Sequence, residues 1–286
     1  MAGTTSKKSS ASVKHRPKLG QNFLTDLGAA RRIVDALGDV SNRTVIEIGP
    51  GRGVLTDVLV SRAKRVIGIE LDRVLAAQLR MRYATKTNVE ILESDFVAAE
   101  FTSMVGRRPG PLHDLRPTQP ETVDVIGNLP YYVTSDIVLR ILELHQNIER
   151  AVIMVQREVA DHISAAPGGR DYGLLSATVQ LFARVDKLFT LPPGAFSPPP
   201  QVYSSVLRLT MAPRPPELRV EEGPFIAFLR VAFGHKRKTL LNNLRGQYGD
   251  VAIRAALKSA GLRADARAEA MSLEKTAAVF RALQQA

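Results

Sequence analysis

Short apolar runs alternate with segments of helical spacing along residues 26–212. The runs are rich in β-branched residues, which is typical of strands that are buried on both faces of a parallel sheet. Between most of them, apolar residues recur every three or four positions, as on one face of a helix. The predicted strands are 44–49, 65–71, 89–95, 123–129, 150–156, 185–191 and 204–210, and the clearest predicted helices are 54–62, 74–83 and 135–145. This alternation predicts an α/β fold with a mostly parallel sheet that is covered by helices.

Three other segments depart from this pattern. Residues 1–16 are mainly Ser, Lys, Thr and Ala, a composition for which disorder is expected. Residues 102–122 hold four prolines and predict an irregular surface insertion between strands. After the prolines at 213–216 the spacing is helical to the end. The expected organisation is therefore a disordered basic tail (1–16), an α/β domain (17–212) and a small helical domain (213–286).

The composition excludes several classes of protein. The 286 residues are enough for one large and one small domain, with 45% hydrophobic and 23% charged content. No run approaches the roughly 18 apolar residues of a membrane span, and no apolar signal region follows the start. The chain has no cysteine, which excludes disulfides and thiolate zinc sites and fits a reducing cytoplasm. The five histidines are scattered, so no metal site is expected.

The net charge of +11 is concentrated at two places. Residues 1–25 carry five Lys or Arg and no acid, and residues 225–267 carry nine Lys or Arg against two acids. The rest of the chain is nearly neutral. Two basic patches on a neutral body predict a polyanionic partner such as a nucleic acid. The alternative is that the charges serve only solubility.

A glycine-rich turn follows the first predicted strand in the segment EIGPGRGVLT. Gly49, Gly51 and Gly53 allow the backbone to approach a ligand closely, because no Cβ intervenes. Glu70 ends the second strand about twenty residues further on, where an acid accepts hydrogen bonds from ribose hydroxyls. A nicotinamide cofactor and S-adenosylmethionine both satisfy this pattern, and so does a purely structural turn.

Two further acids narrow the choice of cofactor. Asp95 follows the third strand, where its carboxylate can accept from the exocyclic amine of an adenine or cap a following helix. Glu47 can orient the methionine ammonium group indirectly or accept from a nearby backbone donor. Acids near the ends of three successive strands favour S-adenosylmethionine.

The segment NLPYYVTS follows the fourth predicted strand and brings an amide beside an aromatic ring. Strands of open α/β sheets bind ligands at their carboxyl ends, so Asn128 is expected beside the reactive end of the cofactor. The Asn128 side-chain oxygen and the Leu129 carbonyl can accept from one amine, while Pro130 holds the chain and Tyr131 offers a face on which a base stacks. The alternative makes these residues a turn-former, a helix start and core filler.

This arrangement suits methyl transfer to a base amine. The lone pair of an exocyclic amine is delocalised into the ring, and two acceptors outside the ring plane pull the nitrogen toward a tetrahedral shape. A sulfonium methyl is already activated, so positioning supplies most of the catalysis and no strong base is required.

These motifs together resemble the KsgA-type ribosomal RNA adenine dimethyltransferases. The matching segments, in chain order, are GQNFL (20–24), EIGPGRGVLT (47–56), IELD (69–72), SDF (94–96), NLPYYVTS (128–135), AFSPPPQVYSSVLRL (195–209) and HKRKTLLNNL (235–244). The resemblance implies a class I methyltransferase domain over 17–212 and an rRNA-binding helical domain over 213–286. It implies S-adenosylmethionine as donor and dimethylation at N6 of two adjacent adenosines near the 3′ end of small-subunit (16S) rRNA.

The resemblance also implies roles for individual residues. Those expected to contact the cofactor are Asn22, Leu24, Gly49, Gly51, Glu70, Asp95 and Asn128. Those expected at the reaction itself are Asn128, Leu129, Pro130, Tyr131 and Phe196. Phe196 is expected to cover the second face of the adenine or, alternatively, to plug the space under the proline-rich link, and Tyr132 is expected to pack in the core. Those expected to hold rRNA phosphates are Lys236, Arg237, Lys238 and Arg245.

The expected partners are small-subunit rRNA and the pre-30S particle, for a monomer in the cytoplasm. Two alternatives keep most of these features: a large-subunit rRNA methyltransferase of the macrolide-resistance type, and a non-catalytic assembly factor. A nicotinamide oxidoreductase would need a site that handles hydride, and no motif supplies one.

Overall fold

The computed structural model describes residues 22–101 and 122–285. The predicted tail at 1–16 lies outside the described residues, as does all but the last residue of the predicted insertion at 102–122. Among the residues that are described, no helix is both long enough and apolar enough to cross a membrane.

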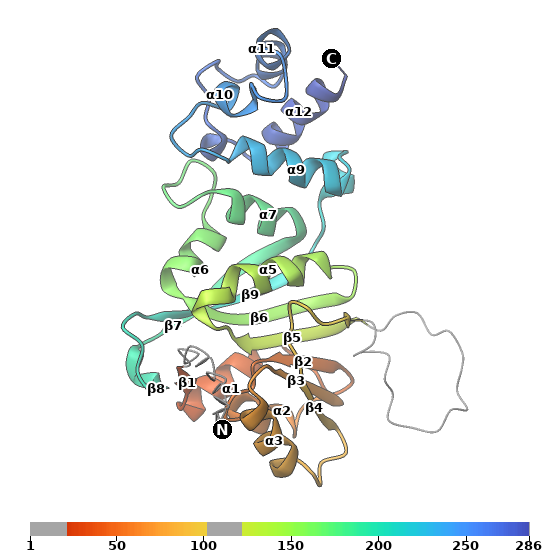
Figure 1. The fold of residues 1–286 in the computed structure, drawn as a ribbon, viewed down its shortest axis with the longest axis vertical. Helices are drawn as coiled ribbons and strands as arrows, with labels where there is room; N and C mark the ends of the chain where they lie inside the picture. Colours follow the sequence, from red (N-terminus) through yellow and green to blue (C-terminus); the bar gives the residue numbers. More distant parts are fainter. Residues whose placement is uncertain (1–21, 102–121, 286) are drawn as a thin grey trace, which may run out of the picture.

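A seven-stranded sheet forms the centre of the fold, in the order β4-β3-β2-β5-β6-β9-β7 (Figure 1). Its strands are β2 (Thr44–Ile48), β3 (Arg65–Glu70), β4 (Val89–Glu93), β5 (Val123–Asn128), β6 (Ile148–Gln156), β7 (Ala183–Leu191) and β9 (Ser204–Met211). The first five are parallel, and β9 runs antiparallel to both β6 and β7. Every predicted strand is present, with ends that differ from the prediction by at most two residues.

A separate two-stranded sheet joins segments that are far apart in sequence. The strands β1 (Phe23–Leu24) and β8 (Phe196–Ser197) pair antiparallel, with Leu24 opposite Phe196. The pairing brings the GQNFL segment against the proline-rich link, and Figure 1 shows β1 and β8 at the same edge of the molecule as α6.

The helices cover both faces of the large sheet and then continue beyond it. The helices of the α/β part are α1 (Leu27–Asp35), α2 (Val54–Leu59), α3 (Arg73–Arg82), α5 (Thr134–Glu143), α6 (Arg157–Ser164) and α7 (Leu174–Phe182). The later helices are α8 (Pro215–Leu218), α9 (Glu222–Ala232), α10 (Leu240–Leu244), α11 (Asp250–Ser259) and α12 (Leu273–Gln284). Three short 3₁₀ helices are η1 (Tyr131–Val133), η2 (Pro193–Ala195) and η3 (Ala268–Ala270).

Alternation along the strands explains why both faces are apolar. In β2, Val45 belongs to the core cluster under α1 and α2, while Ile46 belongs to the cluster on the other face. Successive side chains of a strand point to opposite faces, so a strand that is covered on both sides needs a continuous apolar run. The predicted parallel sheet with two covered faces is therefore observed.

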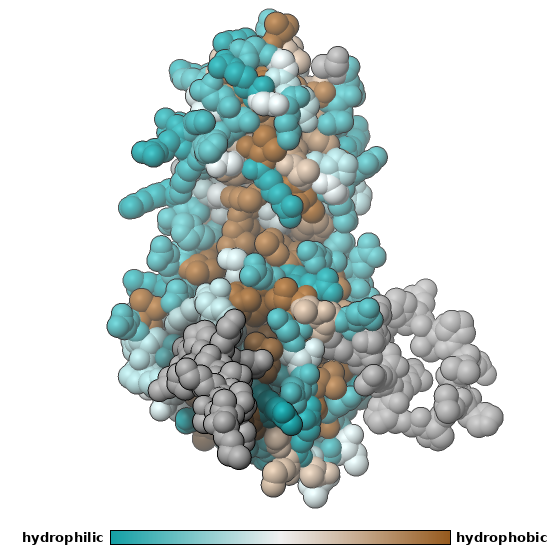
Figure 2. Space-filling view, viewed as in Figure 1, coloured by the Kyte–Doolittle hydropathy of each residue, from teal (hydrophilic) through white to brown (hydrophobic). Residues whose placement is uncertain are grey.

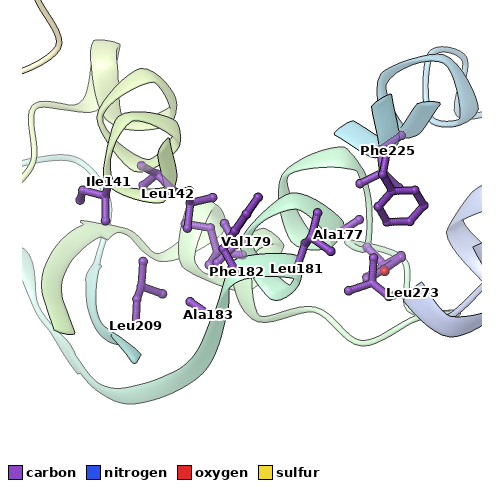
Figure 3. Close-up of a cluster of buried hydrophobic side chains, with 14 of the residues drawn as sticks. Ile141, Leu142, Ala177, Val179, Leu181, Phe182, Ala183, Leu209, Phe225 and Leu273 are labelled. Atoms are coloured by element: carbon purple, nitrogen blue, oxygen red, sulfur yellow. The ribbon is translucent and has the colours of Figure 1, made fainter. Parts of the chain in front are cut away.

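The helix α7 connects the sheet to the terminal helices through one continuous core. Figure 3 shows Phe182 near the sheet residue Leu209, whereas Ala177 and Leu181 lie toward Phe225 of α9 and Leu273 of α12. All six side chains are buried in the same cluster. The predicted boundary at 212/213 falls between β9 and α8, but the two parts share a core across it. Figure 2 shows apolar side chains along the middle of this view with polar side chains on its flanks.

Candidate active site

One pocket lies at the carboxyl edge of the sheet, where the strand order reverses between β2 and β5. Such a reversal opens a crevice between the two loops that leave the strands, which is where open α/β sheets bind ligands. The predicted residues that line the pocket are Asn22, Leu24, Gly49, Gly51, Glu70, Asp95, Asn128, Leu129, Pro130 and Tyr131. The fold thus brings the glycine turn, the strand-end acids and the NLPY segment into one cavity.

The glycine turn after β2 has a conformation that favours glycine. Gly49, Gly51 and Gly53 have φ of 61°, 58° and 80°, in the left-handed region. A Cβ on Gly51 would lie 2.9 Å from the ring of Phe23, whereas a Cβ on Gly49 would meet no atom within 4 Å. The turn therefore presents bare backbone to the pocket.

Glu70 joins the end of β3 to that turn. One oxygen of its buried carboxylate accepts from the Gly51 N–H at 2.9 Å, and the other accepts from the Asp72 N–H at 2.9 Å. Burial raises the pKa of Glu70, and these backbone donors oppose the rise. Each carboxylate oxygen has a second lone pair, so the group can position the turn and still accept from a ligand hydroxyl.

Glu47 is the most deeply buried acid of the pocket wall, with 1% of its surface exposed. The Thr56 hydroxyl donates a hydrogen bond to Glu47 Oε2 at 2.6 Å. The carboxyl group therefore has a side-chain donor in addition to the backbone donor that the sequence suggested. Burial raises the pKa of Glu47 to about 8, and repulsion from Glu70 and Asp57 acts in the same direction. The carboxyl group is thus mostly protonated at neutral pH.

The side chain of Asn128 is oriented by a residue more than a hundred positions away. Its Nδ2 donates to the Asn22 carbonyl at 2.9 Å, and the adjacent Leu129 N–H donates to the Met154 carbonyl at 3.0 Å. Because the NH₂ group faces a carbonyl, the amide flip is determined and Oδ1 is directed away from Asn22. No described residue donates to Oδ1, which leaves it available as an acceptor in the pocket.

The aromatic ring beside this amide is also held in place. The Tyr131 and Ser204 hydroxyls form a hydrogen bond of 3.1 Å, and Ser204 is buried at the start of β9. Pro130 has an extended backbone, precedes η1 and accepts through its carbonyl from the Thr134 hydroxyl at 2.9 Å. The ring of Tyr131 is half-buried and lines the pocket.

Asp95 lies in an exposed turn beyond β4, at the pocket rim. Its Oδ1 accepts from the Val97 N–H at 2.9 Å, so the carboxylate closes a turn rather than capping a regular helix. Its other oxygen has no hydrogen bond from a described residue.

Two aromatic residues near the pocket, Tyr132 and Phe196, compare differently with their predicted positions. Tyr132, expected in the core, is 62% exposed and lines the pocket, because η1 turns its side chain outward after Tyr131. The expected core position is therefore wrong. Phe196 is 4% exposed and packs in the core cluster under α1, outside the pocket lining, because β8 pairs with β1. This position agrees with the alternative of a hydrophobic plug, and the role of Phe196 in covering a base stays a prediction.

Two of the pocket-wall residues that the sequence did not predict lie against each other. Phe23 and Arg52 both line the pocket, and the Arg52 guanidinium carbon lies 4.5 Å from the Phe23 ring centroid. The only sequence signal is that each lies inside a matched motif, Phe23 in GQNFL and Arg52 in the glycine turn.

The four predicted phosphate-binding residues lie far from this pocket in sequence, and two of them have protein partners. Lys236 donates to the Arg170 carbonyl at 2.8 Å, and Arg245 forms an ion pair with Asp250. Arg237 and Lys238 lie exposed in the turn between α9 and α10, without an ion pair to any residue that the structure describes. Figure 1 shows this link on the same side of the molecule as α6.

The fold and the pocket together define a class I methyltransferase. The parallel sheet carries the glycine turn after β2, Glu70 at the end of β3 and the acceptor amide of Asn128 at the end of β5, where the strand order reverses. These groups fit an adenosyl ligand. The profile of the family "Ribosomal RNA adenine dimethylase" matches residues 12–285. The chain belongs to this family.

Relatives and solved structures agree with this placement. The chain is 60% identical to the "Ribosomal RNA small subunit methyltransferase A" of Koribacter versatilis, over 94% of each chain. It is 54% identical to the protein of the same name from Acidobacterium capsulatum, over 96% of this chain and 93% of the relative. The crystal structure of the 23S rRNA methyltransferase ErmE is similar with a TM-score of 0.67 and 27% identity, covering 92% of this chain and all of that one. A dimethyladenosine transferase from Plasmodium falciparum, at 23% identity and a TM-score of 0.76, shares the fold over 92% of this chain and 98% of its own.

Proposed function

We propose that this protein uses S-adenosylmethionine to dimethylate N6 of two adjacent adenosines near the 3′ end of small-subunit rRNA, during assembly of the subunit. The family membership and the names of the relatives support this reaction and this subunit. The observation that carries the proposal is the orientation of Asn128, whose Oδ1 is left free beside the half-buried ring of Tyr131.

In this proposal some residues of the pocket wall hold the methyl donor, and others support the Asn128 amide. The glycine turn and Glu70 hold the adenosyl part of the donor, with Asp95 at the rim for the adenine amine. Asn22 acts through its carbonyl, which accepts from the Asn128 amide and holds it in place. Leu24 is a buried apolar residue of the pocket wall. When bound, S-adenosylmethionine supplies a methyl group on a positively charged sulfur.

The protein contributes position and hydrogen-bond acceptors to the transfer. Tyr131 stacks on the target adenine, which is worth roughly 1–3 kcal/mol. Asn128 Oδ1 and the Leu129 carbonyl accept from the N6 amine and turn its lone pair toward the methyl group. The proton of that amine becomes acidic once the new bond forms, so the pocket needs no dedicated base.

The target adenine must leave its stack to reach this pocket. Unstacking costs a few kcal/mol, and the cost is lowest in a loop.

We propose that the exposed Arg237 and Lys238 hold rRNA phosphates, which gives affinity without base recognition. The protein would act as a cytoplasmic monomer on the pre-30S particle.

The test replaces Asn128 by alanine. Asn128→Ala is expected to abolish tritium transfer from labelled S-adenosylmethionine to unmethylated small subunits, while subunit binding persists. Asn42→Ala is the matched control, because Asn42 is exposed at the opposite end of β2. Full activity of Asn128→Ala would refute the assigned role.

A large-subunit rRNA methyltransferase is the second candidate, since the ErmE structure shares the fold at 27% identity. The two candidates are separated by offering purified large and small subunits to the same enzyme. Labelling of the large subunit alone would reverse the proposal, and labelling of neither would favour a non-catalytic assembly factor.

A further inference from the structure

An exposed aromatic residue and an exposed cation lie against each other at the carboxyl edge of the sheet. The Arg157 guanidinium carbon is 5.4 Å from the ring centroid of Tyr203, and the backbone N–H of Arg157 donates to the backbone carbonyl of Tyr203 at 2.9 Å. The register explains the pairing. Gln156 at the end of β6 lies opposite Ser204 at the start of β9, so Arg157 and Tyr203 are the next residues beyond that pair.

This pair has binding capacity that the fold leaves unused. Tyr203 is 47% exposed, although it is a large aromatic residue. Within residues 22–101 and 122–285, Arg157 has no acidic partner and the Tyr203 hydroxyl has no hydrogen bond. The exposed position of these two side chains is therefore not explained by packing in the core. A surface contact between a guanidinium and an aromatic ring also contributes little to the stability of the fold.

The pair is linked to the pocket wall through Ser204. Ser204, the neighbour of Tyr203, is buried, and its hydroxyl bonds to the Tyr131 hydroxyl at 3.1 Å. One peptide unit and one hydrogen bond thus separate the exposed ring from the ring on which the target adenine is proposed to stack. We therefore expect an RNA strand that places one base on Tyr131 to pass this edge.

We propose that Tyr203 and Arg157 form a platform for the nucleotide next to the target adenosine, with the base stacked on Tyr203 and its phosphate paired with Arg157. This rests on the proposed function. An aromatic face suits any base, and an unpaired guanidinium suits a phosphate. The platform would hold the strand in position while the neighbouring adenosine is in the pocket, so both are positioning residues.

The first experiment measures methyl transfer to small subunits. Tyr203→Ala is expected to lower kcat/KM roughly 5- to 150-fold, the range for loss of one stacked base, mainly through KM. Tyr203→Phe restores the ring and is expected to recover kcat/KM to within about threefold, because the hydroxyl has no partner. Met81→Ala is the control for loss of an exposed apolar side chain, since Met81 is 80% exposed on α3, which packs beside β3 and β4.

The second experiment needs no catalysis. Binding is compared between a short single-stranded oligoadenosine RNA and the same RNA with abasic sites on both sides of its central adenosine. The wild-type protein is expected to prefer the intact RNA roughly 5- to 150-fold, and Tyr203→Ala is expected to lose most of that preference. Arg157→Gln is expected to weaken binding to both RNAs and to reduce its dependence on salt by about one phosphate contact.

The outcomes separate the platform from the methyltransferase assignment. If the wild-type protein does not methylate small subunits, the proposed function fails, whereas the RNA comparison still decides the platform. An undiminished preference in Tyr203→Ala, or an equal loss in Tyr203→Phe, would overturn the stacking role. Unchanged melting of the variants shows that the fold is intact.

Discussion

The protonated state of Glu47 has a measurable consequence for stability. Glu47 is replaced by glutamine, which keeps the size of the side chain, accepts from the Thr56 hydroxyl and cannot ionise. In the folded protein the pKa of Glu47 is raised from its ordinary value of 4.5 to about 8, chiefly by burial. The folded state therefore keeps a proton that the unfolded state loses above pH 4.5.

The sign and size of the effect follow from this difference. Stability from a raised carboxyl pKa is fully present below the unfolded pKa and is lost as pH rises through the folded pKa. Each pH unit between the two values costs about 1.4 kcal/mol. From pH 5 to pH 8 the wild-type protein is expected to lose roughly 3–4 kcal/mol relative to Glu47→Gln.

Urea unfolding of both proteins at pH 5, 6, 7 and 8, without methyl donor, measures the effect. Burial also raises the pKa of Asp124, whose shift arises from burial, Arg43 and Arg150 and not from Glu47, so its contribution cancels in the difference. Glu70 repels Glu47, so the difference reports the Glu47 carboxyl together with its coupling to Glu70. A difference in unfolding free energy that stays constant within about 0.5 kcal/mol across this range would show that Glu47 is ionised in the folded state.

Three further predictions concern the turn, the junction and the basic link. Gly51→Ala forces a Cβ against Phe23 at a positive φ, and calorimetry is expected to show donor binding at least tenfold weaker; unchanged binding would contradict the close approach. Phe225→Ala removes a fully buried ring where α9 meets α7, and urea unfolding is expected to show a loss of about 3–5 kcal/mol; a loss below about 1 kcal/mol would contradict the shared core. Arg237→Glu combined with Lys238→Glu is expected to weaken small-subunit binding and its salt dependence in filter assays while donor affinity is unchanged; equal binding at low salt would remove both residues from the rRNA contact.

Local patterns in the chain predicted much of this fold. Near-continuous apolar runs such as that of β2 are needed only where both faces of a strand are covered. They therefore predicted a parallel sheet and the succession of strands and helices along the chain. The glycine turn followed from steric limits on φ, and the pocket edge followed from the rule that ligands bind where parallel strands end. The strand ends were within two residues because β-branched runs stop where the turn residues begin.

Contacts between distant segments could not be predicted from such patterns. The bond from Asn128 to the Asn22 carbonyl, the burial of Phe196 by β1 and the exposure of Tyr132 all depend on how a link returns to the sheet. A single sequence encodes residue types and short-range spacing, which determine strands, helices and turns. The protonation of Glu47 depends on removal of water from around its carboxyl group, and only the packed tertiary structure decides that.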